Sequence, residues 1–353
     1  MTDPLVDGGD MLLRRLAAGD AEPILVADFQ AFSSAPRLSQ LVCNSAPGRP
    51  VYQVDPLAAL SQDRPYISLA DLAAEAADSF ARSQPADGPA YVIGYCSASA
   101  LALHIATLLA RSREATAVLL RPSWPSTQSV EETFSTLAAN MGAPQLPCPE
   151  LDGDPDRSVR SMEEQLAEQL AVLTSSQGLD ASADTFGELL LTYRSWLAFL
   201  LACSNDSRAD TADGPSTVTV LAEAPDSVTV PGLAAGRFKV YPLPVLDDEN
   251  PVTPEVVELL AAQLLSRPDP SDGCDNHPAI GGWLPQPSAQ VGGLRGRVGG
   301  ARAGGLRGRK VRGRGGARPG RCAARGRGGG VRGGVMRPGK CAAGVCGGGV
   351  ARG

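Results

Sequence analysis

The stretch Ala90-Tyr91-Val92-Ile93-Gly94-Tyr95-Cys96-Ser97-Ala98-Ser99-Ala100-Leu101-Ala102-Leu103-His104-Ile105-Ala106 decides the fold. It begins with a short apolar run that fits a buried strand, and it ends with an Ala- and Leu-rich run that fits a helix. Between the two runs lie Gly94, Cys96 and a series of small residues, which allow a helix to pack close to a sharp turn. The pattern predicts a strand that turns directly into a helix, with the side chain of Cys96 exposed at the apex.

The spacing Gly94-x-Cys96-x-Ala98 is a variant of the nucleophile elbow, G-x-S-x-G. The N-terminus of the following helix would point at the apex, and its positive end favours a thiolate. Two interpretations of this stretch remain open. Cys96 is either a nucleophile or an inert thiol in a purely structural turn.

The rest of the chain alternates predicted strands with predicted helices, which indicates a parallel sheet with crossover helices and the α/β class. Further strands are expected at 24–27, 51–54, 117–120, 217–222 and 237–241. Helices are expected at 11–18, 37–43, 68–80, 131–141, 159–173, 186–203 and 255–265.

These features resemble the thioesterase family of α/β-hydrolases that serves polyketide and nonribosomal-peptide assembly lines. The resemblance runs from about Ile24 to Leu265. It implies an α/β-hydrolase fold, with a mostly parallel central sheet, helices on both faces and a helical lid at about 128–204. The domain would span 1–267, followed by a linker at 268–290.

The resemblance also implies a chemistry. Cys96 would cleave an acyl thioester from a phosphopantetheinylated acyl or peptidyl carrier protein, with the backbone N–H of Ser97 as one oxyanion donor. Asp226, or less favourably Glu223, would be the acid, because some members of the family place it after the strand that corresponds to 217–222. No cofactor and no metal ion is expected.

Several positions depart from the family's pattern. The loop after the last strand has no His, and Asp248, between Asp247 and Glu249, stands there as a candidate weak base. Arg121 stands where many members carry the acid. These departures keep a rival hypothesis open, in which the chain is a catalytically inactive relative that binds a carrier protein or an acyl chain.

Only two histidines exist, and neither fits the position of the missing base. His104 lies eight residues after Cys96, roughly 12 Å along a helix, which favours a role in helix packing. His277 lies beyond the predicted fold. The loop at 28–34 also lacks the glycines that the family uses for its second oxyanion donor.

Charge divides the chain into two parts. Residues 291–353 carry 16 Lys and Arg and no acidic residue, whereas residues 1–290 carry the other 16 basic residues and all 38 acidic ones. The Gly- and Arg-rich tail is predicted to be disordered. It is either a nucleic-acid-binding tail or the product of GC-rich DNA read out of frame, and the acidic body argues against nucleic-acid binding by the folded part.

Cysteine usage and the N-terminus bear on the compartment. The chain has eight Cys, and the five within residues 1–290 lack the paired spacing of a disulfide framework, which favours a reducing cytoplasm. The N-terminal residues do not form a signal peptide, and no stretch is expected to span a membrane.

Overall fold

The structure is a computed structural model that describes residues 12–29, 37–61, 64–84, 88–151, 153–177, 183–206, 214–243 and 253–265. The expectations for Asp248 and His277, and those for the linker at 268–290 and the tail at 291–353, lie outside the described residues. All architectural statements below concern the described part of the chain.

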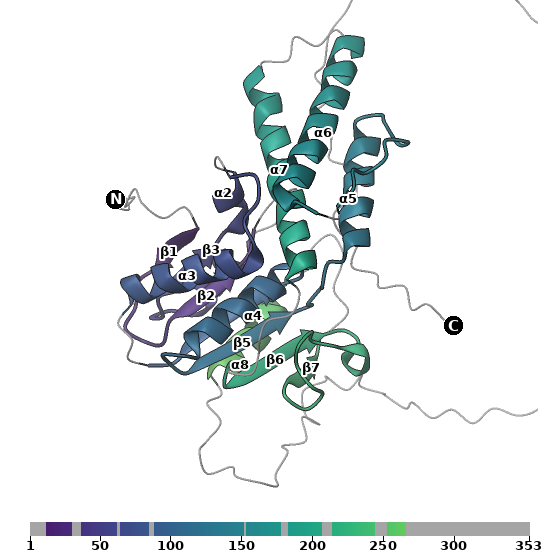
Figure 1. Ribbon diagram of the computed structural model, residues 1–353. Helices are drawn as coiled ribbons and strands as arrows, with labels where there is room; N and C mark the ends of the chain where they lie inside the picture. The colour runs from purple at the N-terminus through teal and green to yellow at the C-terminus, as the bar shows by residue number, and fades with distance from the viewer. Residues whose placement is uncertain are drawn as a thin grey trace, which may run out of the picture. The chain divides into compact units, whose positions relative to one another are not determined.

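A seven-stranded sheet with the order β1-β3-β2-β4-β5-β6-β7 forms the centre (Figure 1). Its strands are β1 (Leu13–Ala17), β2 (Ile24–Ala27), β3 (Val51–Val54), β4 (Ala90–Tyr95), β5 (Ala115–Leu120), β6 (Thr217–Ala222) and β7 (Lys239–Pro242). Every neighbouring pair is parallel except β1 with β3, which is antiparallel. The predicted α/β class with a mostly parallel sheet is confirmed.

The prediction of a helix at 11–18 is wrong. Residues 13–17 form β1, which pairs with the edge of β3 and has a register irregularity between Arg15 and Ala17. The spacing of Leu12, Leu13 and Leu16 fits a helix locally, but an open strand edge satisfies the backbone groups of this segment and buries Leu12 and Leu13. Tertiary pairing therefore overrides the local pattern.

Helices cover both faces of the sheet. On one face lie α3 (Leu69–Ser83) and α4 (Ala98–Leu109), and on the other lie α1 (Leu38–Ser45) and α8 (Pro254–Leu265). The predicted start of α3 is confirmed, because the Ser68 hydroxyl accepts a hydrogen bond from Asp71 N–H at 3.0 Å. Pro254 begins α8, as expected of a first-turn proline.

Three helices are inserted between β5 and β6, namely α5 (Thr127–Asn140), α6 (Pro155–Gln177) and α7 (Ala183–Asn205). Figure 1 shows α6 and α7 running side by side away from the sheet. Arg194 of α7 ties this insert to its surroundings, since it pairs with Glu163 of α6 at 3.6 Å and donates to the Leu60 carbonyl of α2 (Pro56–Leu60) at 3.2 Å.

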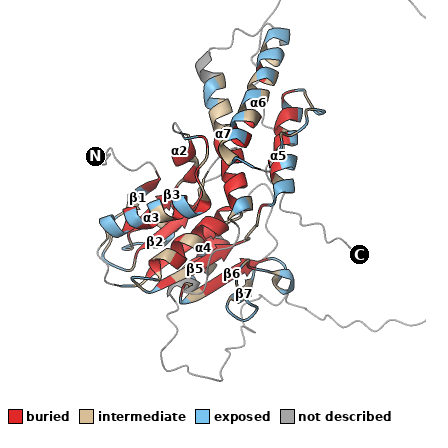
Figure 2. Cartoon of the chain, in the orientation of Figure 1, coloured by how far each residue is buried: buried red, intermediate tan, exposed pale blue. Residues whose placement is uncertain are grey.

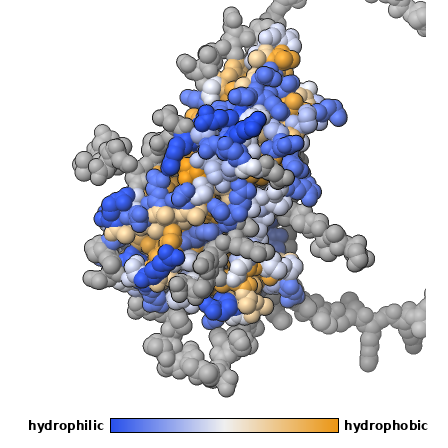
Figure 3. Space-filling view, in the orientation of Figure 1, coloured by the Kyte–Doolittle hydropathy of each residue, from blue (hydrophilic) through white to orange (hydrophobic). Residues whose placement is uncertain are grey.

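Burial falls along α7 from the sheet outward (Figure 2). Residues 197–203 are buried in the core, whereas residues 189–194 are half-buried. On the face shown in Figure 3, hydrophobic residues are interspersed with hydrophilic ones. The segment Phe186–Asn205 is long and apolar enough to cross a membrane, but a core helix passes the same test, so this segment carries no membrane assignment.

Candidate active site

Cys96 occupies the turn between β4 and α4 with a φ of 53°, a left-handed conformation that non-glycine residues rarely adopt. Such a conformation costs on the order of 1–3 kcal/mol and persists only where neighbouring contacts enforce it. Here Cys96 N–H donates to the Leu120 carbonyl at 3.0 Å, and the Cys96 carbonyl accepts from Ser99 N–H and Ser123 N–H, both at 3.1 Å. The sharp turn predicted from the sequence is present, and its apex residue is a half-buried thiol.

Gly94 is required for the close approach of α4 to β4. A Cβ atom at this position would lie 2.6 Å from Ala102 Cβ and 2.7 Å from Ser99 Cα. Both distances are far below van der Waals contact, and one of the two atoms belongs to the backbone. The glycine and the small residues at the start of α4 therefore form one packed unit that holds the turn.

Ser97 lies at the N-cap of α4 and has unused hydrogen-bonding capacity. Its side chain makes no capping bond, and within the described part of the chain its buried Oγ has no partner. Nor does its N–H donate to another described residue. A donor that protein groups leave unpaired at a helix N-terminus is what an oxyanion requires, so the predicted role of Ser97 is compatible with the geometry and stays a prediction.

Arg121 follows β5 directly and is the second non-glycine residue with a positive φ, 46°, in the described part of the chain. Tyr95 pairs with Leu120, and Leu120 pairs with Leu221, so Cys96 and Arg121 stand at one level on adjacent strands. Arg121 Nε lies 3.2 Å from Glu223 Oε1. The position expected for an acid therefore holds a cation, and that cation is paired with the carboxylate that follows β6.

The candidate acid Asp226 lies beyond the end of β6, and its predicted role stays a prediction. It lies in the short 3-10 helix η1 (Pro225–Ser227) after β6, and it is exposed. Strand β5 lies between β4 and β6, so the two strand ends are about 10 Å apart.

His104 packs against the end of α7, as its spacing predicts. Its Nε2 lies 3.0 Å from the Asp206 backbone carbonyl, and burial lowers the pKa of the imidazole below its ordinary value. The ring thus bonds a backbone group two helical turns from the apex. No group of three or more His, Cys, Asp or Glu in the described residues is arranged to hold a metal ion.

Three aromatic side chains, Trp196 and Phe199 of α7 and Phe29 after β2, form a cluster that we call the aromatic wall. Cys203 Sγ contacts the Ser97 carbonyl at 3.7 Å, and Phe199 and Trp196 follow on the same stripe of the helix. Both rings pack against Phe29, with centroids 5.1 and 4.8 Å away. Burial raises the pKa of the Cys203 thiol far above its ordinary value, so Cys203 is a neutral packing residue.

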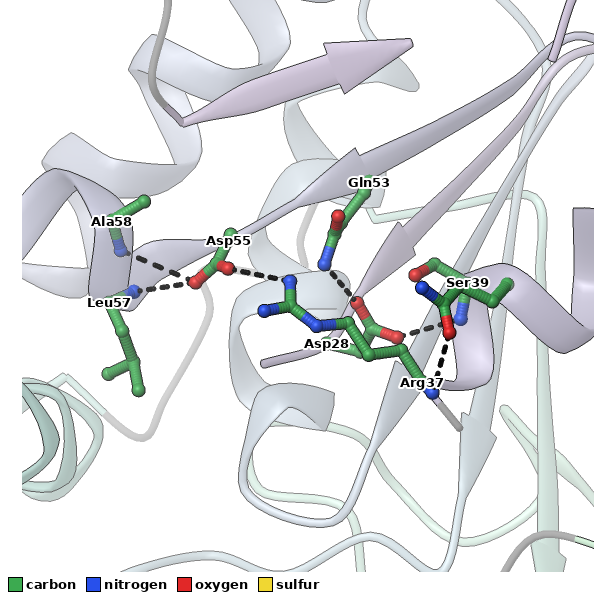
Figure 4. A network of polar contacts seen from close by, with 8 residues as sticks. Asp28, Arg37, Ser39, Gln53, Asp55, Leu57 and Ala58 are labelled. Atoms are coloured by element: carbon green, nitrogen blue, oxygen red, sulfur yellow. Dashed lines mark hydrogen bonds and ion pairs between the residues drawn. The ribbon is translucent and has the colours of Figure 1, made fainter. Parts of the chain in front are cut away.

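The polar cluster at the ends of β2 and β3 was not predicted from the sequence (Figure 4). Asp28 is buried and accepts hydrogen bonds from Ser39 N–H at 2.7 Å and from Gln53 Nε2 at 3.0 Å. Next to it, Arg37 pairs with Asp55 at 3.0 Å, and Asp55 caps α2. A carboxylate directly after a buried strand was the available signal, since such positions lie at the carboxyl edge of the sheet.

Burial is the largest influence on Asp28 and raises the pKa of this carboxyl above its ordinary value of 3.8, while its hydrogen bonds and nearby Arg37 oppose that shift. A separate groove of about 200 Å³ lies between α2 and α7, where Asp55, Leu57 and Leu191 contribute to its lining. None of the predicted site residues lines this groove.

Comparison with known proteins gives a likeness of fold. No family model matches the sequence, and no curated protein matches it. Among solved structures, one similar chain is a four-domain nonribosomal peptide synthetase bound to AMP and glycine, with 16% identity, 73% of this chain covered and a TM-score of 0.45. This chain spans 20% of the length of that synthetase.

The match covers almost the whole length of two further solved structures. One is the NocB thioesterase domain in covalent complex with a fluorophosphonate nocardicin G analogue, with 17% identity, coverage of 71% of this chain and 99% of that one, and a TM-score of 0.41. The other is a putative α/β hydrolase family protein from Desulfitobacterium hafniense, with 13% identity, coverage of 71% and 99%, and a TM-score of 0.43. At these identities the likeness concerns the fold alone.

Proposed function

We propose that this protein is a thioesterase-like hydrolase that cleaves acyl thioesters from a carrier protein, with Cys96 as the nucleophile. The observation that carries the proposal is the left-handed conformation of Cys96 between β4 and α4. Strain of this kind in a non-glycine residue is concentrated at functional sites, and a purely structural turn would be better served by glycine.

The chemistry of the proposed reaction has two steps. The Cys96 thiolate attacks the carbonyl carbon and forms a C–S bond, and the resulting oxyanion accepts a hydrogen bond from Ser97 N–H. Collapse of this intermediate breaks the bond to the pantetheine sulfur, which takes a proton from solvent. Water then adds to the acyl-cysteine, releases a carboxylic acid and restores the thiol.

The aromatic wall supports an apolar acyl group as the substrate. Trp196 of α7 and Phe29 after β2 are half-buried and pack against each other. The stripe of α7 that carries Trp196 begins at the contact between Cys203 and Ser97. An acyl chain bound to Cys96 would therefore find aromatic surface near the nucleophile. The insert α5–α7 would act as the lid, and a carrier protein would deliver the thioester.

A second candidate function is binding without catalysis. Two observations favour it, because Arg121 and Glu223 neutralise one another where an acid is expected, and His104 is committed to the Asp206 carbonyl. Such a protein would hold an acyl chain or a carrier domain on the same surface.

The deciding experiment is hydrolysis of an acyl-pantetheine thioester by the full chain, beside Cys96→Ala and the matched control Cys148→Ala. Cys148 is also half-buried, and burial raises the pKa of its thiol to about 11, which makes it unreactive at neutral pH. Hydrolysis lost in Cys96→Ala and kept in Cys148→Ala supports a cysteine thioesterase. Equal rates in all three proteins contradict the catalytic proposal and leave the binding protein.

A further inference from the structure

Cys96, Arg121 and Glu223 follow three adjacent strands, β4, β5 and β6, at the same edge of the sheet. Cys96 and Arg121 each lie one residue beyond the paired positions Tyr95 and Leu120 of adjacent strands. Glu223 follows the next strand and bonds Arg121 Nε at 3.2 Å. The three groups therefore form a row across the carboxyl edge of the sheet.

Backbone contacts fix this row. Cys96 N–H donates to the Leu120 carbonyl, and Arg121 N–H donates to the Leu221 carbonyl at 2.8 Å. Ser123 N–H donates a hydrogen bond to the Cys96 carbonyl, and Trp124 Nε1 donates one to the Thr229 carbonyl at 2.9 Å. The segment after β5 is thus tied both to the turn at Cys96 and to the loop after β6.

The charges in the row are partly shielded from solvent. The side chains of Arg121 and Glu223 are 22% and 29% exposed, and Cys96 is half-buried. Charges in such positions interact more strongly than charges in bulk water and are less screened by salt. A guanidinium near a thiol favours the thiolate, which is the reactive form of cysteine.

We propose that Arg121 is a positioning residue that favours the thiolate form of Cys96 in place of a histidine, and that Glu223 limits this effect by pairing with Arg121. The proposal rests on the proposed role of Cys96 as the nucleophile. It explains why a cation occupies the position where an acid is expected, since a thiolate needs a positive neighbour and needs no acid to orient a histidine.

Other titratable groups near the turn are few in the described residues. They are Tyr95 at the end of β4, Asp28 at the end of β2, Cys203 on α7, Asp206 directly after α7, His104 on α4, and Asp226 after β6. Asp28 is engaged with Ser39 and Gln53, and the buried Cys203 thiol stays neutral. Arg121 is thus the described cation at the same level of the sheet as Cys96.

The test is the rate of Cys96 alkylation by iodoacetamide as a function of pH, followed by peptide mass spectrometry on the full chain. At pH 7, Arg121→Gln is expected to slow alkylation roughly threefold to tenfold, since it removes about one screened charge interaction. Glu223→Gln is expected to speed alkylation about twofold, because it releases the charge of Arg121. Arg121→Lys should keep most of the wild-type rate.

Two controls separate this effect from loss of structure. Arg37→Gln removes a guanidinium that also pairs with a carboxylate at this edge of the sheet, and it should leave Cys96 alkylation unchanged. In 1 M salt the difference between wild type and Arg121→Gln should shrink. A fall in rate for both Arg121→Gln and Glu223→Gln, or an equal fall for Arg37→Gln, would overturn the proposal.

The outcome is distinct from that of the hydrolysis experiment. If the pH profiles shift in opposite directions but no thioester is hydrolysed, Arg121 tunes the thiol and the proposed hydrolase is wrong. If hydrolysis depends on Cys96 but the rate of Cys96 alkylation is the same in wild type and Arg121→Gln, the proposed hydrolase is supported and this inference is wrong.

Discussion

The carboxyl ends of β2 and β4 lie side by side in one sheet, yet they are built in opposite ways. At the end of β2, Asp28 is buried and both of its oxygens accept hydrogen bonds. At the end of β4, Cys96 is half-buried in a strained conformation, and within the described part of the chain the neighbouring Ser97 Oγ is buried without a partner. The first region is a buried carboxylate held by two hydrogen bonds, whereas the second is a half-buried thiol in a strained turn at a helix N-terminus.

The contrast separates a structural cluster from a candidate site. The hydrogen bonds of Asp28 and Asp55 join α1 and α2 to the strands and rigidify this part of the fold. Backbone strain adds nothing to stability, so another contribution must explain why the strain at Cys96 is present. The row of Cys96, Arg121 and Glu223 is accordingly the part of this edge on which function is expected to depend.

Gly94→Ala is expected to have the largest effect on this comparison. The added Cβ would overlap Ala102 Cβ and Ser99 Cα, so α4 must move away from β4, at a cost of about 3 kcal/mol. The measurement is the free energy of unfolding in urea. Gly187→Ala is the matched control, because a Cβ there meets nothing within 4 Å and alanine favours a helix. Equal destabilisation by both changes would show that the close approach at Gly94 is unimportant.

Asp28→Asn should break the hydrogen-bonded cluster at the end of β2. The amide NH₂ group would face the donors of Ser39 and Gln53, and one donor would lose its acceptor, at a cost of about 2 kcal/mol in the free energy of unfolding. The exposed Asp226→Asn serves as the control and should change stability by less than about 0.5 kcal/mol.

The raised pKa of Asp28 predicts how the free energy of unfolding changes with pH. Burial raises its pKa in the folded state above the ordinary 3.8, so the folded protein retains this proton after the unfolded chain has released it. The contribution of Asp28 to stability is therefore full below pH 3.8 and declines as the pH rises through the folded pKa. The stability advantage of wild type over Asp28→Asn should shrink over that window, and an advantage that grows with pH would contradict the assignment.

Cys96→Gly and Cys96→Ala test the backbone strain in the turn after β4. Both remove the thiol, but glycine adopts a φ of 53° without strain, whereas alanine does not. Cys96→Gly should therefore be more stable than Cys96→Ala by about 1 kcal/mol. Thermal unfolding of the two variants measures the strain directly, and equal stability would mean that the turn relaxes when the thiol is lost.

His104→Gln is expected to have the smallest effect. Glutamine can donate to the Asp206 carbonyl as the imidazole does, so stability at pH 8 should change by less than about 1 kcal/mol and thioester hydrolysis should be unaffected. Loss of hydrolysis would instead place His104 in the reaction.

The pH profile of the same variant has a defined sign. Burial lowers the pKa of His104 below 6.5, so the unfolded chain takes up this proton first as the pH falls. Wild type should lose stability as the pH falls below 6.5 and through the folded pKa, and the glutamine variant should lack this component. Melting temperatures between pH 5 and 8 test the difference.

The sequence by itself determined the strand-turn-helix at Gly94 and Cys96, the mostly parallel orientation of the strands and the apolar face of α7. These features follow from local spacing, because apolar periodicity and the positions of small residues indicate which faces are buried. The sequence also identified Arg121 as a departure from the expected acid.

Only the tertiary structure decided what the isolated patterns left open. Residues 13–17 became the edge strand β1, because β3 offered a partner that local spacing does not encode. The pairing of Arg121 with Glu223 and the bonds of Asp28 with Ser39 and Gln53 join residues far apart in the chain. Such contacts depend on which strand ends become neighbours, and that order is fixed only when the whole sheet assembles.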